Sequence, residues 1–234
     1  MRVLAIMCHP DDMELNCSGT LLKYKAEGHD VIVCHAANGN MGHYEIMPDE
    51  LRIIRAKEAE KAAKIGGFEI VSADIDDLKI NSGSEEQLKK IVKIIRDAKP
   101  DLIITHNPND YCSDHNELSK LVFKASFDAT CPHFMPELGD SVDLTPIYYT
   151  DTDLGVNNIP TEFVDITDYI DIKEKMLSCH ESQLVWLKEH DGIDVVKQLR
   201  TVAEFRGNQS GVPYAEAFTG VLSSGRIRTY RMLP

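Results

Sequence analysis

The stretch Met7-Cys8-His9-Pro10-Asp11-Asp12-Met13-Glu14 decides how the rest of the chain is interpreted. It follows Val3-Leu4-Ala5-Ile6, an apolar run that is short and aliphatic enough to be a buried strand. Pro10 cannot donate to a sheet ladder, so the strand should end here. One imidazole and two neighbouring carboxylates therefore leave the carboxyl end of a first strand together. In open α/β sheets that edge is where ligands bind.

These residue types are typical of a zinc site. Imidazole nitrogen and carboxylate oxygen are common Zn²⁺ donors, and catalytic zinc takes three protein ligands and keeps one position for water. Because Asp11 and Asp12 are neighbours on a non-helical backbone, their side chains should point in different directions. One can then hold a metal while the other acts as a base. The alternative is a polar turn in which an aspartate caps the next helix, and this stretch alone leaves both interpretations open.

A second strand leads to a similar group of polar residues. Leu102-Ile103-Ile104-Thr105 is a buried strand by composition, and it runs directly into a histidine. The potential ligands in and after this loop are His106, Asp110, Asp114 and His115. A metal site at this sheet edge needs ligands from more than one strand end. The two loops together therefore favour a shared metal site, whereas the second loop alone would indicate a helix cap and a surface histidine.

Strand and helix patterns alternate along the chain and predict a single α/β domain, residues 1–234. The expected strands are residues 3–6, 31–34, 68–71, 102–105, 147–150 and 163–166. The expected helices are residues 21–27, 49–65, 85–98, 115–129, 168–180 and 193–206. Asp49 is expected to cap the second of these helices, and Ser113 or Asp114 the fourth. The stretch 206–218 is less regular.

Composition excludes several classes of partner. The formal charge of −13 argues against nucleic acid or an anionic membrane, because binding phosphate needs a basic surface. No apolar stretch approaches the roughly 18–20 residues of a membrane span, and the first apolar run is too short for a secretory signal. The six cysteines show no C-x-x-C pair and are typical of reduced thiols. We therefore expect a cytoplasmic protein.

With these residues in view, the chain resembles the PIG-L/LmbE-like family of metal-dependent N-acetyl-sugar deacetylases. Short motifs of that family occur in the family's order and span most of the chain. They are H-P-D-D-x-E at 9–14, C-x-G-T at 17–20, Asn-Gly at 38–39, R-x-x-E-A at 55–59, Asp-His at 114–115, V-D-I-T at 164–167, H-x-S-Q at 180–183, Arg-Gly at 206–207 and Y-A-E-A-F at 214–218.

The resemblance implies a Rossmann-like, mainly parallel sheet with helices on both faces, often assembled as trimers or hexamers. It also implies a single Zn²⁺, or another divalent metal, held by His9, Asp12 and His115. Asp11 would be the general base that takes a proton from zinc-bound water. The implied reaction removes acetate from an N-acetylated amino sugar or glycoconjugate. A soluble small-molecule substrate is expected, because the acidic chain shows no membrane anchor.

Residues for substrate binding are also implied by motif position, namely Arg55, Asn38 and Cys112. For Arg55 the alternative is a structural salt bridge. Cys112 occupies a position where better-known relatives have a histidine that assists catalysis, and a neutral thiol with a reference pKa of about 8.5 is a weak donor. The group that protonates the leaving amine therefore stays open. The candidates are Asp11 itself, His43, His106 and His180.

Two alternatives to a deacetylase follow from the same residues. Cys112 suggests a metal- or sugar-binding protein that has lost catalysis. The second alternative is a metallo-hydrolase that cleaves another acyl or amide bond, because proteins of one fold can act on different substrates. Asp11 favours an enzyme, since a base that is not a metal ligand has little use in a site that only binds.

Overall fold

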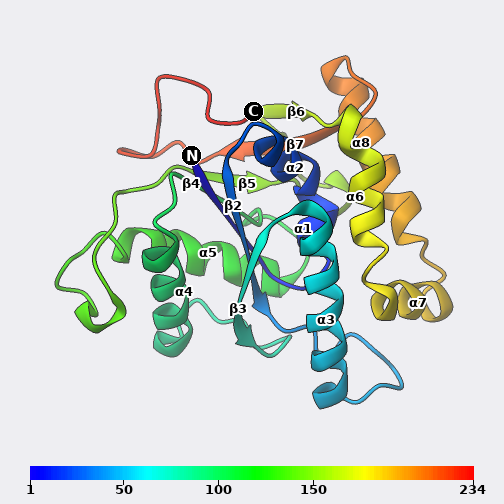
Figure 1. Cartoon of the computed structure of the whole chain (residues 1–234), viewed down its shortest axis with the longest axis horizontal. Helices are drawn as coiled ribbons and strands as arrows, with labels where there is room; N and C mark the ends of the chain where they lie inside the picture. Colours follow the sequence, from blue (N-terminus) through cyan, green and yellow to red (C-terminus); the bar gives the residue numbers. More distant parts are fainter.

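All seven strands belong to one sheet in the computed structural model, which describes residues 1–234 (Figure 1). The strand order is β3-β2-β1-β4-β5-β7-β6. The parallel strands are β1 (Arg2–Met7), β2 (Asp30–Ala37), β3 (Glu69–Ile75), β4 (Leu102–Thr105) and β5 (Ile147–Thr150). The strand β7 (Ala215–Gly220) pairs antiparallel with both β5 and β6 (Glu162–Asp165). The expected mainly parallel, Rossmann-like sheet is confirmed.

The central strand β1 is buried on both faces, and its residues alternate between two cores. Val3, Ala5 and Met7 pack into one core, whereas Leu4 and Ile6 pack into the other. Successive side chains of a strand point to opposite faces, so an unbroken aliphatic run suits a strand covered on both sides. This explains why the opening run of the sequence contains no polar residue before the turn.

Helices cover both faces, as expected. The first face carries α2 (Ser18–Ala26), α3 (Pro48–Gly66), α6 (Ile170–Leu177) and α8 (Val195–Ser210). The second face carries α4 (Glu85–Ala98) and α5 (Ser113–Asp128). The short elements are α1 (Asp12–Asn16), α7 (Glu181–His190) and the 3-10 turns η1 (Pro136–Leu138), η2 (Asp153–Gly155) and η3 (Thr167–Tyr169). None of these helices has the length and apolarity that crossing a membrane requires.

Two of the expected helix caps are not found in the structure. The helix α3 begins at Pro48, so Asp49 lies in its first turn and does not cap it. The helix α5 begins at Ser113, and Cys112 takes the cap position without a side-chain hydrogen bond. Asp114 does not cap the helix. Its carboxylate accepts the Leu78 N–H at 2.7 Å and lies next to His9 in the loop after β1. The six cysteines are free thiols. That residues 1–234 form a single domain stays a prediction.

The order in which strands are added to the sheet reverses at β1, because β2 and β3 lie on one side of β1 and β4 and β5 lie on the other. Ligand sites of open α/β sheets lie at this switch point, at the carboxyl ends of the strands. Ile6 pairs with Thr105, so the loops after β1 and β4 leave the sheet at the same level. The Cys8 N–H donates to Nε2 of His106 at 2.9 Å. The two polar loops of the sequence are therefore neighbours.

Candidate active site

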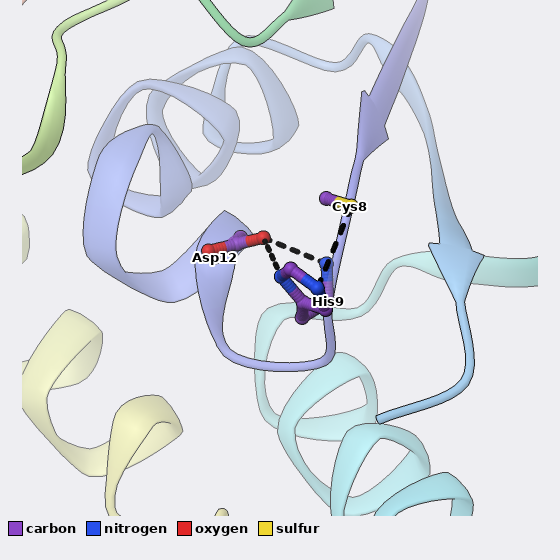
Figure 2. Close-up of side chains that lie close together, drawn as sticks. All are labelled: Cys8, His9 and Asp12. Carbon is purple, nitrogen blue, oxygen red and sulfur yellow. Dashed lines mark hydrogen bonds and ion pairs between the residues drawn. The ribbon is translucent and has the colours of Figure 1, made fainter. Parts of the chain in front are cut away.

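The turn after β1 separates its two aspartates. Asp11 has φ 105°, a left-handed conformation that is uncommon outside glycine. Asp12 accepts the His9 N–H at 2.7 Å and so closes the turn. The Asp12 carboxylate faces the His9 ring (Figure 2), whereas the Asp11 carboxylate turns to Arg55. The two neighbouring carboxylates therefore point in different directions, as the sequence predicts.

Asp12 Oδ2 lies at the centre of a group of three imidazoles. It is 3.2 Å from Nδ1 of His9, 3.2 Å from Nε2 of His106 and 3.2 Å from Nε2 of His115. The rings of His106 and His115 stack with centroids 3.8 Å apart. The structure thus brings together the three predicted ligands and adds His106 from the end of β4.

Two of these imidazoles contact a second carboxylate through their other ring nitrogen. Nε2 of His9 is 3.3 Å from Asp114 Oδ2, and Nδ1 of His115 is 3.4 Å from Asp110 Oδ1. Metal-binding histidines usually donate their far N–H to such a carboxylate, which fixes the tautomer. In a neutral ring these contacts would place the proton on the far nitrogen of each histidine. The nitrogen that faces Asp12 would then be the one that binds a metal.

His106 and Cys8 are less suited to hold a metal, although their donor atoms are close enough. The groups whose donor atoms lie within 4.8 Å of one another are Asp12, His106 and His115, and Cys8, His9 and Asp12. Nε2 of His106 already accepts the Cys8 N–H, and its Nδ1 is buried without a partner. Burial raises the pKa of the Cys8 thiol to about 11, so it is not a thiolate at neutral pH.

The charges of the cluster suit a cation. Burial alone would raise the pKa of Asp12, but His115 and His106 hold it well below its usual range. Burial alone would lower the pKa of His115, but Asp12 and Asp110 raise it well above the usual value. Without metal the cluster therefore keeps protons, which a bound cation would displace. Two imidazoles and a carboxylate are a donor set that fits Zn²⁺.

Arg55 holds the Asp11 carboxylate. Its Nη2 donates to Asp11 Oδ2 at 3.0 Å and to the Pro10 carbonyl, and its Nη1 donates to Gln183 Oε1 at 2.6 Å. The arginine is buried against Gly39, which has φ +77° and where a Cβ would lie 2.7 Å from the arginine side chain. Only glycine fits there. Burial raises the pKa of Asp11 to about 6, opposed by Arg55.

A hollow of about 340 Å³ opens beside the cluster, and its wall includes Asp11, Arg55 and Cys112. Cys112 is half-buried, and its thiol has a lowered pKa because contact with His115 outweighs burial. Asn38 does not line this hollow. Its amide donates to Asp74 and Asp76 at 3.2 and 3.3 Å, and it lines a neighbouring hollow. The structure therefore brings two of the three predicted substrate-binding residues to the pocket.

Some functional contacts were not found from the sequence. Asp110 and Asp114 were recognised as potential ligands but not as partners of the histidine rings. Gln183 was noticed only as part of a late motif, although it holds Arg55. The sequence spacing of Asp110 and His115 carries no sign of their contact, because it depends on how the loop after β4 folds.

Comparison with known proteins identifies the family. The family described as GlcNAc-PI de-N-acetylase, PIG-L, matches residues 4–126. The chain belongs to the PIG-L family. Diacetylchitobiose deacetylase of Thermococcus kodakarensis is 31% identical in sequence, over 92% of this chain and 81% of that protein. The expected relation to N-acetyl-sugar deacetylases, which are hydrolases of amide bonds, is confirmed.

Solved structures show the same architecture. The N,N'-diacetylchitobiose deacetylase from Pyrococcus horikoshii superposes with a TM-score of 0.80 at 28% identity, covering 94% of this chain and 83% of that one. The 4-carboxy-2-hydroxymuconate hydratase from Pseudomonas putida has a TM-score of 0.83 at 22% identity and full coverage of both chains. The latter likeness shows the fold alone. The reaction must therefore be argued from the site residues.

Proposed function

We propose that this protein is a metal-dependent hydrolase that removes the acetyl group from a small, soluble N-acetylated amino sugar. The observation that carries the proposal is the position of Asp12 between two imidazoles that are each held by a second carboxylate. A base, Asp11, lines the same pocket. The deacetylase relatives support the acetyl group of an amino sugar as the reacting group.

Zn²⁺ is the metal that we propose, with His9, Asp12 and His115 as its ligands. When bound, it supplies Lewis acidity, which polarises an amide carbonyl and lowers the pKa of water. Asp114 and Asp110 would keep the two histidine rings in the binding tautomer. His106 supports the β1 turn through its bond with the Cys8 N–H and is not assigned as a ligand.

Asp11 is the proposed general base and then the acid. It takes a proton from the attacking water while the oxygen adds to the acetyl carbon. When the C–N bond breaks, Asp11 returns this proton to the nitrogen, and acetate and the free amine leave. Burial raises the pKa of Asp11 above the usual value of a carboxyl, which favours a group that both accepts and returns a proton.

The remaining predicted residues take different parts in this proposal. Arg55 is a positioning residue, because its Nη donors are used by Asp11, Pro10 and Gln183. Cys112 contacts substrate from the pocket wall. Asn38 shapes the loop that contains Gly39, since its side chain accepts the Asn40 N–H within that loop and donates to Asp74 of β3.

The test is a metal analysis combined with acetate release from a panel of N-acetylglucosamine derivatives. We expect about one zinc per chain and acetate release by the wild type. Asp11→Asn should keep the metal and lose about 10²- to 10⁴-fold in turnover. Asp140→Asn, which removes one charge from an exposed loop, is the control. If the wild type and Asp11→Asn were equally inert on the whole panel, a protein that only binds metal or sugar would be the better interpretation.

Assembly and location belong to the proposal as well. A trimer or hexamer and a cytoplasmic location stay predictions. Light scattering of the purified protein measures the first, and a monomer would contradict it.

A further inference from the structure

Four aromatic side chains form a row at the edge of the candidate site, which we call the aromatic row. It comprises His43, Tyr44, Trp186 and His190. Tyr44 and Trp186 have ring centroids 5.3 Å apart, and Trp186 stacks on His190 at 4.2 Å. His43 stacks on Tyr44 at 5.1 Å. The row joins the loop 38–47 to α7, two segments far apart in sequence that lie on the same side of the molecule (Figure 1).

The aromatic row belongs to two segments that also line the pocket that holds Asp11. Met41 and Gly42, from the loop 38–47, line that pocket, and so do Gln183 and Leu187 from α7. The two segments also meet where a Cβ on Gly42 would lie 2.9 Å from Gln183 Oε1. Tyr44 follows Gly42 closely in sequence and Trp186 is next to Leu187, so the aromatic row borders the residues that line the pocket.

The aromatic row is open to solvent and held in place. Tyr44 is 50% exposed, Trp186 is partly exposed, and the His190 side chain is 54% exposed. The Tyr44 hydroxyl donates to Glu189 Oε2 at 3.1 Å, which fixes the ring and places a carboxylate beside it. Aromatic faces carry negative charge and attract the polarised C–H groups of a ligand. A carboxylate next to such a face can accept hydroxyl hydrogens.

We propose that the aromatic row is a second sugar subsite, which binds the pyranose ring attached to the amino sugar being deacetylated. A pyranose offers both chemistries, a face of C–H groups for the rings and hydroxyls for Glu189. Fixed rings lose little conformational freedom on binding, which favours them as a platform. The inference rests on the proposed function for the position of the first sugar.

The chain contains one tryptophan, so its fluorescence reports on this place alone. The experiment titrates Asp11→Asn protein, in which the sugar stays intact, with N,N'-diacetylchitobiose and with N-acetylglucosamine. We expect a saturable change in Trp186 emission with the disaccharide, at lower concentration than with the monosaccharide. Absence of a saturable change with the disaccharide overturns the subsite. A response to tetramethylammonium instead of the disaccharide also overturns it, since the aromatic row would then be a cation site.

Kinetics of variants give a second readout. Trp186→Ala should raise the KM for the disaccharide about fivefold more than the KM for the monosaccharide, with Trp186→Phe intermediate. Tyr230→Ala, at a 63% exposed tyrosine that lines a different hollow, is the matched control. An equal rise in KM for both sugars would show a structural role and overturn the subsite. If neither sugar is deacetylated, the proposed function fails, and the fluorescence titration still decides the subsite.

Discussion

Replacing Asp114 with asparagine tests how the structure prepares His9 for a metal. The Asp114 carboxylate is 3.3 Å from Nε2 of His9 and also accepts the Leu78 N–H at 2.7 Å. Both contacts use the same atom, Asp114 Oδ2. Asparagine has nearly the same shape, and an amide oxygen in this place can keep both contacts. The variant therefore removes only the negative charge behind His9, which holds the proton on Nε2 and raises the basicity of the nitrogen that faces Asp12. A neutral partner should weaken metal binding.

The expected magnitude follows from the loss of one such carboxylate partner. Removing it typically weakens metal affinity 10- to 100-fold, which corresponds to about 1.4–2.7 kcal/mol. We expect a zinc Kd higher by this factor, measured by competition with a chromophoric chelator. Acetate release should return towards the wild-type rate when zinc is raised above the new Kd, because Asp11 and Arg55 keep their contact.

Two outcomes would refute this reasoning. A Kd within about twofold of the wild-type value would show that the charge of Asp114 does not prepare His9 for the metal. Activity that stays low at saturating zinc would show that Asp114 acts in another way. Asp140→Asn, with the same change in charge on an exposed loop, should leave the Kd unchanged.

Three further predictions concern stability and the pocket. Lys173→Met should lower the free energy of unfolding, measured in urea, by about 3–5 kcal/mol. The reason is that Glu216 stays buried but loses its ion pair with the Lys173 ammonium, which lies 2.5 Å from Glu216 Oε1. A loss below about 1 kcal/mol would contradict this. Despite burial, contact with His180 lowers the pKa of Glu14 below 4.5, and contact with Glu14 raises the pKa of His180 above 6.5. The contact between Glu14 and His180 therefore stabilises the fold less as the pH falls through the pKa of Glu14 or rises through the pKa of His180. Glu14→Gln should lower the free energy of unfolding most between pH 4.5 and 6.5. A difference in unfolding free energy that does not change with pH would contradict this. Cys112→His should leave acetate release unchanged or raise it, because imidazole is the better donor; a large loss would reveal a role of the thiol.

The sheet centre and the converging loops could be predicted because local patterns encode them. The aliphatic runs of β1 and β4 need burial on both faces, and a histidine follows each run closely. Parallel neighbouring strands end at the same edge, so ligands that follow them meet. The position of α4 also follows from sequence, since Ser84 accepts the Gln87 N–H and an apolar stripe follows.

Elements that depend on distant contacts were not predicted. The strand β7 lies in a stretch that looked irregular, and its Glu216 accepts the N–H groups of Gly19 and Thr20 at the start of α2. Nothing local in either segment indicates that pairing. The contacts of Asn38 show the same limit, because its side chain donates to Asp74 and Asp76 at the end of β3, far away in sequence; that Asn38 binds substrate stays a prediction.

The most direct measurement is the anomalous difference density of a zinc-loaded crystal, collected at the zinc absorption edge. The account predicts one ion about 2.0–2.2 Å from Nδ1 of His9, a carboxylate oxygen of Asp12 and Nε2 of His115, with His106 still accepting the Cys8 N–H. An ion bound by His106 in place of His9, or no ion while these side chains bond elsewhere, would contradict it.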